Sequence, residues 1–334
     1  MKKNNISAII IFCVMAAVAV AACVIIPLTA SVPQNEDTDT DSAPVIAAKD
    51  RMNILIGGCD RTSGLTDVMM ILSVDENNGS ATVLQIPRDT YAEYTEKSYK
   101  KLNGAYGALG AEGLCQFLSR GLGVRIDKYL IMSPDAFVGV VDALGGVEIY
   151  LDKPMRYSDP EQGLYISLDA GRQILDGKRA EQFVRYRSGY ADGDLGRLDA
   201  QKKFLSGLLS SVRKNTDPIT VARLTAVLLG KTDTNISPAD GIRLTEVLLS
   251  FDLSRLYLVT APGEAVRAGK SGASYYSLSA PAMEKILCEY LGAESGSFDR
   301  EELFKNEKYE AFIGAYGRNA PIRVYTVKKL IEGS

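Results

Sequence analysis

The sequence predicts an α/β protein in which a mixed central β-sheet lies between helical layers, preceded by one N-terminal transmembrane helix. Three observations predict this architecture: apolar runs of strand length interleave with amphipathic helical stretches, an Asn-Gly pair joins two early runs, and a long apolar stretch precedes them all. With 334 residues, of which 46% are hydrophobic, the chain can bury one large core or two smaller ones.

The apolar stretch at residues 6–30 is long enough to cross a hydrocarbon core of about 30 Å as a helix. Lys2 and Lys3 precede it and an acidic segment follows it, so we expect a cytoplasmic N-terminus and a single span in the cell membrane, with the rest of the chain extracytoplasmic. A cleaved signal peptide is the alternative, because residues 20–23 faintly resemble a lipoprotein cleavage box. The apolar run continues past Cys23, however, and its length favours an uncleaved anchor.

Composition divides the chain into four regions. Residues 1–30 are the cytoplasmic N-terminus and the anchor, and residues 31–50 are an acidic linker that holds the folded part away from the membrane. Residues 51–295 are the folded domain. Residues 296–334 are a C-terminal tail to which the sequence assigns no role.

Short apolar runs predict the strands of the sheet. We expect strands at 53–56, 68–74, 81–86, 129–132, 147–151 and 256–260. Asn78 and Gly79 lie between the second and third of these runs and predict a hairpin turn. Pro87 ends the third strand, which leaves Arg88 and Asp89 at its C-terminal edge.

Apolar residues at helical spacing predict the helices. We expect them around 113–122, 134–144, 178–184, 198–212, 218–229, 238–249 and 280–291. Because the helices interleave with the strands while the early strands are joined by a hairpin, a mixed sheet covered by helices is the predicted arrangement.

Charge and composition exclude several classes of function. The net charge is -3 with nearly balanced acids and bases, so we expect no nucleic-acid partner. Histidine is absent, which removes the usual general base, the His-dependent Ser and Cys nucleophiles and imidazole zinc sites. Any metal must be held by carboxylates, which favours Mg²⁺ with Mn²⁺ as the alternative.

The cysteines predict no special chemistry. Three of the five, Cys59, Cys115 and Cys288, lie beyond the apolar stretch, and their spacing matches neither a zinc site nor a regular disulfide framework. Burial as small apolar side chains is the simplest expectation for them.

Two aspartates lie between the first two predicted strands. Asp60 follows Gly57-Gly58-Cys59, and Asp67 follows Leu65-Thr66. Carboxylates at the end of one strand and the start of the next can converge on a divalent cation, which needs hard oxygen ligands. Aspartate beside glycine is also common in turns, and the spacing alone favours that simpler interpretation.

Arginines follow in three further stretches. Arg88 lies beside Asp89, for which a surface salt bridge is the simplest explanation. Arg185 and Arg187 follow a predicted helix; their guanidinium groups share one face only if the chain becomes extended there. The last stretch is Asp194-Leu195-Gly196-Arg197, with Gln201 one helical turn further on.

The ordered set of these stretches resembles the LytR-CpsA-Psr (LCP) family closely. That family has a Gly/Ser-Asp turn, Thr-Asp, Pro-Arg-Asp, Lys-Leu-Asn-Ala-Tyr, Gly-Gly-Val, Leu-Asp-Gly leading to Val-Arg-x-Arg, and Asp-x-Gly-Arg with a downstream Gln. The matching stretches here lie at 58–60, 66–67, 87–89, 101–106, 145–147, 175–177, 184–187, 194–197 and 201. The resemblance is strong over residues 52–212 and looser to about residue 291.

The resemblance implies roles for individual residues. Asp60 and Asp67 correspond to carboxylates that bind magnesium. The expected catalytic residues are Arg88, Asp89, Arg185, Arg187, Arg197 and Gln201, of which the four arginines grip the substrate pyrophosphate. Lys101 and Asn103 match the pattern as parts of the site's architecture.

The resemblance also implies an activity and its partners. The expected enzyme is a Mg-dependent phosphotransferase that moves a phosphate-linked glycan, such as teichoic acid or capsule, from a polyprenyl pyrophosphate carrier to the 6-hydroxyl of N-acetylmuramic acid in peptidoglycan. An apolar groove in the fold would hold the polyprenyl tail. The alternatives are a hydrolase of the same substrate and a non-catalytic lipid-binding or regulatory membrane protein. Leu65 and Ala200 stand where the family usually has arginine, so the head group of the substrate stays open.

Overall fold

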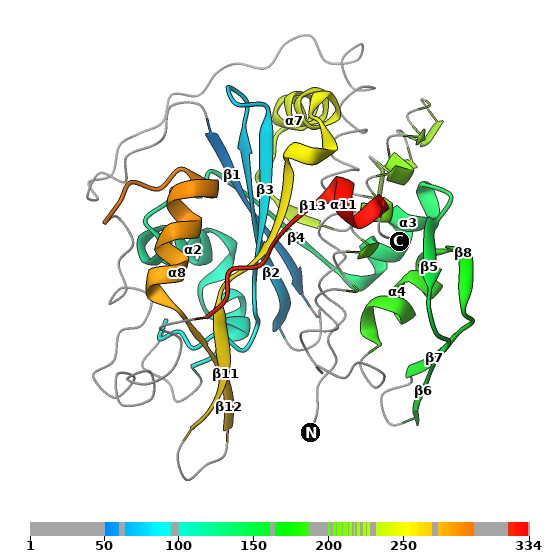
Figure 1. The fold of residues 1–334 in the computed structure, drawn as a ribbon, viewed down its shortest axis with the longest axis horizontal. Coiled ribbons are helices and arrows are strands. Elements are labelled where there is room, and N and C mark those ends of the chain that lie inside the picture. Colours follow the sequence, from blue (N-terminus) through cyan, green and yellow to red (C-terminus); the bar gives the residue numbers. More distant parts are fainter. Residues whose placement is uncertain are drawn as a thin grey trace.

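The structure, a computed structural model, describes the folded part of the chain (Figure 1). It describes residues 51–59, 64–94, 100–160, 164–186, 232–268, 273–296 and 320–332, together with part of 200–230. The predicted anchor and linker, residues 1–50, lie outside these ranges. Within them, no helix combines the length and the apolar character that a membrane crossing requires.

A seven-stranded mixed sheet forms the centre of the fold, as the sequence predicts. Its strands, in spatial order, are β13 (Val324–Thr326), β10 (Leu256–Thr260), β3 (Ser80–Ile86), β2 (Thr66–Asp75), β1 (Arg51–Cys59), β4 (Lys128–Met132) and β9 (Thr232–Thr234). β1, β3, β4 and β10 run in one direction, and β2, β9 and β13 run against them. The tail therefore contributes an edge strand, β13, for which the sequence gives no signal.

Helices and three small two-stranded sheets surround the central sheet. The helical elements are η1 (Leu102–Gly104), α2 (Ala105–Leu122), α3 (Pro134–Ala143), α4 (Gly177–Arg185), α7 (Pro238–Ser250), η3 (Leu253–Arg255), α8 (Ala280–Ile286), η4 (Leu287–Leu291) and α11 (Val327–Glu332). The small sheets pair β5 (Val147–Leu151) with β8 (Gly171–Leu175), β6 (Met155–Asp159) with β7 (Leu164–Leu168), and β11 (Gly263–Ala268) with β12 (Ala273–Leu278). Helical turns also occur in the described part of 200–230.

Alternation along the strands divides the core into two layers. Leu55, Met69 and Ile71 belong to one buried cluster with residues of α2, α8 and η4, whereas Ile54 and Met70 belong to a second cluster with residues of α3 and α4. Successive strand side chains point to opposite faces, so both faces of the sheet must be covered. Figure 1 shows α2 and α8 on one side of the sheet and α3 and α4 on the other.

Two glycines explain where the elements begin and turn. Gly79 has a positive φ of 58° in the β2–β3 hairpin, which confirms the turn predicted from the Asn-Gly pair. Gly110 has φ 71° inside α2 and interrupts its helical geometry. α2 starts at Ala105, well before the predicted start near residue 113. The sequence pattern misses the first turns because glycines weaken their helical signal.

Cys59, Cys115 and Cys288 form no disulfide bonds among the described residues. Cys115 is buried, and burial raises the pKa of its thiol to about 12. Cys59 and Cys288 are only partly buried, so the expected burial holds fully for Cys115 alone among these three.

Candidate active site

Several of the predicted site residues, Asp67, Arg88 and Asp89, lie at one edge of the central sheet. We call this the carboxyl edge, because the parallel strands β1, β3, β4 and β10 all end there. β2 begins at the same edge, since Thr66 is paired with Cys59 at the end of β1. Ligands of open α/β sheets bind outside the carboxyl ends of the strands, so this edge is the natural place for a site.

Asp67 lies at an irregularity in the β1–β2 pairing. Gly58 is paired with Val68 and Cys59 with Thr66, so Asp67 is the extra residue of a β-bulge. Such bulges turn a side chain away from the regular pleat and recur beside active sites. Asp60 directly follows Cys59 in the sequence; it and the side chain of Asp67 lie outside the described residues. The backbone of Asp67 lies at this edge, and carboxylate oxygens are the hard donors that magnesium prefers, so the magnesium site stays a prediction.

Arg88 and Asp89 form a turn directly after β3, and distant segments hold its backbone. Thr90 donates from its backbone N (3.0 Å) and its hydroxyl (2.6 Å) to the carbonyl of Pro87. The backbone N of Asn103 donates to the carbonyl of Arg88 (3.1 Å), and that of Tyr276 donates to the carbonyl of Asp89 (2.8 Å). The turn is therefore fixed from two sides, as the positioning of functional groups requires.

Lys101 is the nearer cation to the Asp89 carboxylate. Its Nζ lies 2.8 Å from Asp89 Oδ1, whereas Arg88 Nε lies 4.0 Å from Oδ2. The same ammonium lies 5.4 Å from the ring centre of Tyr275, a cation–π distance. Asp89 keeps a side-chain exposure of 33%, so its carboxylate is oriented by Lys101 yet still accessible to a ligand.

Thr66 and Asn103 tie the start of β2 to the segment before α2. Thr66 is fully buried and its hydroxyl donates to the carbonyl of Asn103 (3.1 Å). Gly64 and Gly107 approach so closely that a Cβ on Gly107 would lie 2.9 Å from the Gly64 carbonyl oxygen. The loop before Asp67 therefore packs directly against the first turn of α2.

Sequence reasoning missed a hydrogen bond at the same edge. The Tyr106 hydroxyl on α2 donates to the Asp233 carboxylate on β9 (3.0 Å). Burial, and then the neighbouring Asp233, raise the pKa of Tyr106 well above its usual value, so the phenol remains a protonated donor at neutral pH. Tyr106 belongs to the Lys-Leu-Asn-Ala-Tyr stretch, but Asp233 lies on a three-residue strand that has no apolar pattern.

Arg185 lies on a different element and has a partner there. It is the last residue of α4, and its Nη1 lies 3.2 Å from Glu181 Oε1, with side-chain exposures of only 10% and 13%. The residue that follows the helix, Tyr186, has an extended backbone with φ -64° and ψ 135°. Whether Arg185 and Arg187 share a face stays a prediction, because Arg187, like Arg197 and Gln201, lies outside the described residues.

The structure therefore brings some of the predicted residues together. Arg88 and Asp89 lie in one turn with Lys101 beside them, and the backbone of Asp67 lies at the same edge. Arg185 lies on α4, which packs against α3 at its first residue: a Cβ on Gly177 would lie 2.3 Å from the carbonyl oxygen of Val138.

The model of the LytR_cpsA_psr family matches residues 26–290 of this chain. Two similar proteins are teichoic acid transferases by name. "Polyisoprenyl-teichoic acid--peptidoglycan teichoic acid transferase TagV" of Bacillus subtilis (strain 168) is 26% identical over 67% of this chain and 58% of its own length. The transferase of the same description, TagU, of Oceanobacillus iheyensis is 27% identical over 78% of this chain and 82% of its own length. The match with TagV thus spans less than two thirds of that relative.

A solved structure shows the same fold. Protein gbs0355 from Streptococcus agalactiae superposes with a TM-score of 0.67 at 19% identity, covering 79% of this chain and 95% of that one. At this identity the likeness concerns the fold alone.

Proposed function

This chain belongs to the LytR_cpsA_psr family, and from that premise we propose that it transfers a phosphate-linked glycan from a polyprenyl pyrophosphate carrier to peptidoglycan. The observation that carries the proposal is the Arg88–Asp89 turn at the carboxyl edge, beside the bulge that holds Asp67. It places a cationic fork, a partly exposed carboxylate and a candidate metal ligand at one edge. The names of the similar transferases support the same reaction class.

In the proposed reaction, the 6-hydroxyl oxygen of N-acetylmuramic acid attacks the sugar-proximal phosphorus. A new phosphorus–oxygen bond forms, the bond from that phosphorus to the bridging oxygen breaks, and polyprenyl phosphate leaves with the bridging oxygen. The hydroxyl proton passes to a base, for which the accessible Asp89 carboxylate is the candidate in this chain. No histidine and no covalent intermediate is needed.

Phosphoryl transfer depends mainly on positioning and charge stabilisation. Arg88, together with Arg185, Arg187 and Arg197, would hold the pyrophosphate through paired hydrogen bonds to its oxygens. Lys101 would keep the Asp89 carboxylate turned toward the acceptor. A magnesium ion held by Asp60 and Asp67 would supply further positive charge to the pyrophosphate.

The proposed topology is an uncleaved anchor with the folded domain outside the cell. We expect protease added to intact cells to remove the bulk of the protein, because only residues before the apolar stretch would lie inside. Membrane-impermeant labelling of an added N-terminal cysteine should fail in the same cells. Full protection of the folded domain would contradict the topology, and a shortened mature N-terminus would indicate cleavage instead.

The decisive experiment for the function is a transfer assay with the full chain in detergent. The substrates are a synthetic polyprenyl-pyrophosphoryl sugar and wall fragments, with magnesium present. Covalent attachment of the sugar to the fragments supports the proposal. Free phosphorylated sugar instead would identify a hydrolase, and retained lipid binding with no turnover would identify a binding or regulatory protein.

Arg185→Lys tests whether this arginine grips the pyrophosphate or only pairs with Glu181. A lysine keeps the charge beside Glu181 but cannot form the two-pronged hydrogen bonds of the guanidinium. We therefore expect the transfer rate to fall by roughly tenfold or more, with little change in the melting midpoint. Rate and midpoint are measured on each purified variant.

Arg179→Lys on the same helix is the matched control, because the Arg179 side chain donates hydrogen bonds to Gln173 and Ile174 of β8. Its rate should stay unchanged. An unaltered rate for Arg185→Lys would remove Arg185 from the site. If Arg185→Lys and Glu181→Gln lower the melting midpoint equally, the Arg185–Glu181 pair serves to stabilise α4.

A further inference from the structure

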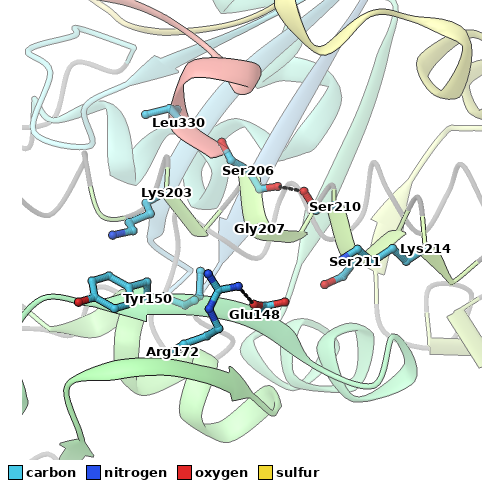
Figure 2. Close-up of a pocket in the computed structure, with 11 residues that line it drawn as sticks. Glu148, Tyr150, Arg172, Lys203, Ser206, Gly207, Ser210, Ser211, Lys214 and Leu330 are labelled. Atoms are coloured by element: carbon cyan, nitrogen blue, oxygen red, sulfur yellow. Dashed lines mark hydrogen bonds and ion pairs between the residues drawn. The ribbon is translucent and has the colours of Figure 1, made fainter. Parts of the chain in front are cut away.

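A solvent-open cavity, whose lining includes no residue of the carboxyl-edge turn, lies between the β5–β8 sheet and a helical segment formed by the described residues among 203–214 (Figure 2). Its volume is about 210 Å³. Most of the residues that line it are of polar or charged type, among them Glu148, Tyr150, Arg172, Lys203, Ser210 and Lys214. Small-molecule pockets usually measure roughly 300 to 1,000 Å³, so this cavity fits one sugar-sized or phosphate-sized group.

The walls of the cavity follow from strand register and helical spacing. In the β5–β8 pair, Tyr150 lies opposite Arg172, on the face that points away from the buried side chains of β5. On the helical segment, Lys203, Ser210 and Lys214 are spaced so that they share one face. Gly207 lets that face approach β5 closely, because a Cβ there would lie 2.8 Å from the Glu148 carbonyl oxygen.

The lining carries an excess of positive charge, although the whole chain has a net charge of -3. Arg172 Nη1 lies 2.5 Å from Glu148 Oε1, so these two charges offset one another. Lys203 lies 3.8 Å from Asp152, whose side chain is 80% exposed, a weak pairing. Lys214 has no partner among the residues that the structure describes. Two ammonium groups thus keep charge that a ligand can use.

Hydroxyl groups and one aromatic ring complete the lining. The Ser210 hydroxyl donates to the carbonyl of Ser206 (3.1 Å), which leaves its oxygen free to accept, and Ser211 lies beside it. Tyr150 is exposed, and the Lys203 ammonium lies 5.7 Å from its ring centre. Figure 2 shows Tyr150 and Lys203 at one end of the cavity and Ser211 and Lys214 at the other.

We propose that this cavity binds one repeating unit of a phosphodiester-linked glycan or polyol. The ammonium groups would pair with the phosphate oxygens, the serine hydroxyls would bond to polymer hydroxyls, and the ring face of Tyr150 would cover an apolar face of the sugar or polyol. For the source of the polymer, the inference rests on the proposed function. It adds a second contact for the polymer, separate from the turn that would hold the pyrophosphate.

The test uses the full chain in detergent and a fluorescent oligomer of glycerol phosphate that carries no lipid. Binding is measured by anisotropy in an Arg88→Gln background, which weakens capture at the carboxyl edge. We expect the Lys203→Gln/Lys214→Gln variant to bind the oligomer roughly tenfold more weakly or worse, because each lysine supplies a charge-assisted contact. A neutral oligosaccharide of equal length should bind at least tenfold more weakly than the oligomer to the parent chain.

Arg125→Gln/Lys285→Gln is the matched control, because it removes two positive charges outside the cavity. Its oligomer affinity and the melting midpoints of all variants should equal those of the parent. Equal oligomer binding by the Lys203/Lys214 variant and the parent would overturn the proposal. So would preference for the neutral oligosaccharide, or lysine-dependent binding to phosphatidylglycerol vesicles without binding to the oligomer.

The two proposals fail separately. Lysine-dependent oligomer binding in a chain that shows no transfer would overturn the proposed function and leave the cavity inference standing. Transfer activity, combined with an oligomer affinity that does not change when Lys203 and Lys214 are replaced, would overturn the cavity inference alone. Tyr150→Leu gives an independent reading without a charge change, and it should weaken oligomer binding several-fold while the midpoint stays constant.

Discussion

Arg88→Lys should lower the transfer rate by about 10²- to 10³-fold, the usual cost of losing one donor that stabilises transition-state charge. Lysine retains the positive charge but loses the planar fork that matches two phosphate oxygens. The backbone of Arg88 is held by Asn103 and its side chain is mostly buried, so the guanidinium is oriented before substrate binds. Rate and melting midpoint on the purified variant check the prediction.

The midpoint should move by no more than about 3 °C, because an ion pair at the surface contributes about 0 to 1 kcal/mol. The Arg88–Asp89 pair, at 4.0 Å, belongs to this weak class. Arg125→Lys is the control: Arg125 also pairs with an aspartate, Asp127, but lies at the opposite end of β4. A transfer rate for Arg88→Lys equal to that of the control would remove Arg88 from the chemistry.

Asp67→Asn should raise the magnesium concentration needed for half-maximal activity by roughly tenfold or more. Mutation of groups that only support a metal ligand already costs about 10- to 100-fold in affinity, and a ligand should cost at least as much. The bulge at Asp67 is the structural basis for this prediction, because it singles out this residue from the regular pairing of β2.

Manganese binding followed by electron paramagnetic resonance, in the full chain without substrate, gives a readout independent of turnover. Asp169→Asn is the control, since Asp169 is 84% exposed and pairs with Arg156. Unchanged manganese affinity and unchanged magnesium dependence in Asp67→Asn would exclude Asp67 as a ligand.

The central part of the fold was accessible from sequence because its signals are local. An Asn-Gly turn between two apolar runs predicts the β2–β3 hairpin, and Pro87 predicts where β3 ends. Strand β10 was predicted with its observed bounds for the same reason. β9 and β13 were missed because each has three residues and depends on a partner far away in the chain.

The sequence predicts a set of site residues, but it does not predict the contacts that the described ones make. A surface salt bridge explained Arg88 and Asp89 most simply, yet the closer partner of Asp89 is Lys101, twelve positions further along the chain. The bond between Tyr106 and Asp233 joins residues 127 positions apart, and no spacing rule indicates it. Such contacts arise from tertiary packing, which the local pattern does not encode.

β1 also fixes how the domain must be oriented if residues 6–30 span the membrane. Its first residue, Arg51, is held by Asp75 (2.6 Å) and the carbonyl of Tyr290 (2.8 Å), so the chain enters the domain at the edge opposite the site. A nine-residue strand rises about 30 Å. A carrier head group at the bilayer surface can then reach the carboxyl edge only if that edge faces the membrane and the edge at Arg51 faces away from it. Residues 31–50 can span about 60 Å when extended, which is longer than β1, so the linker is long enough to permit that orientation.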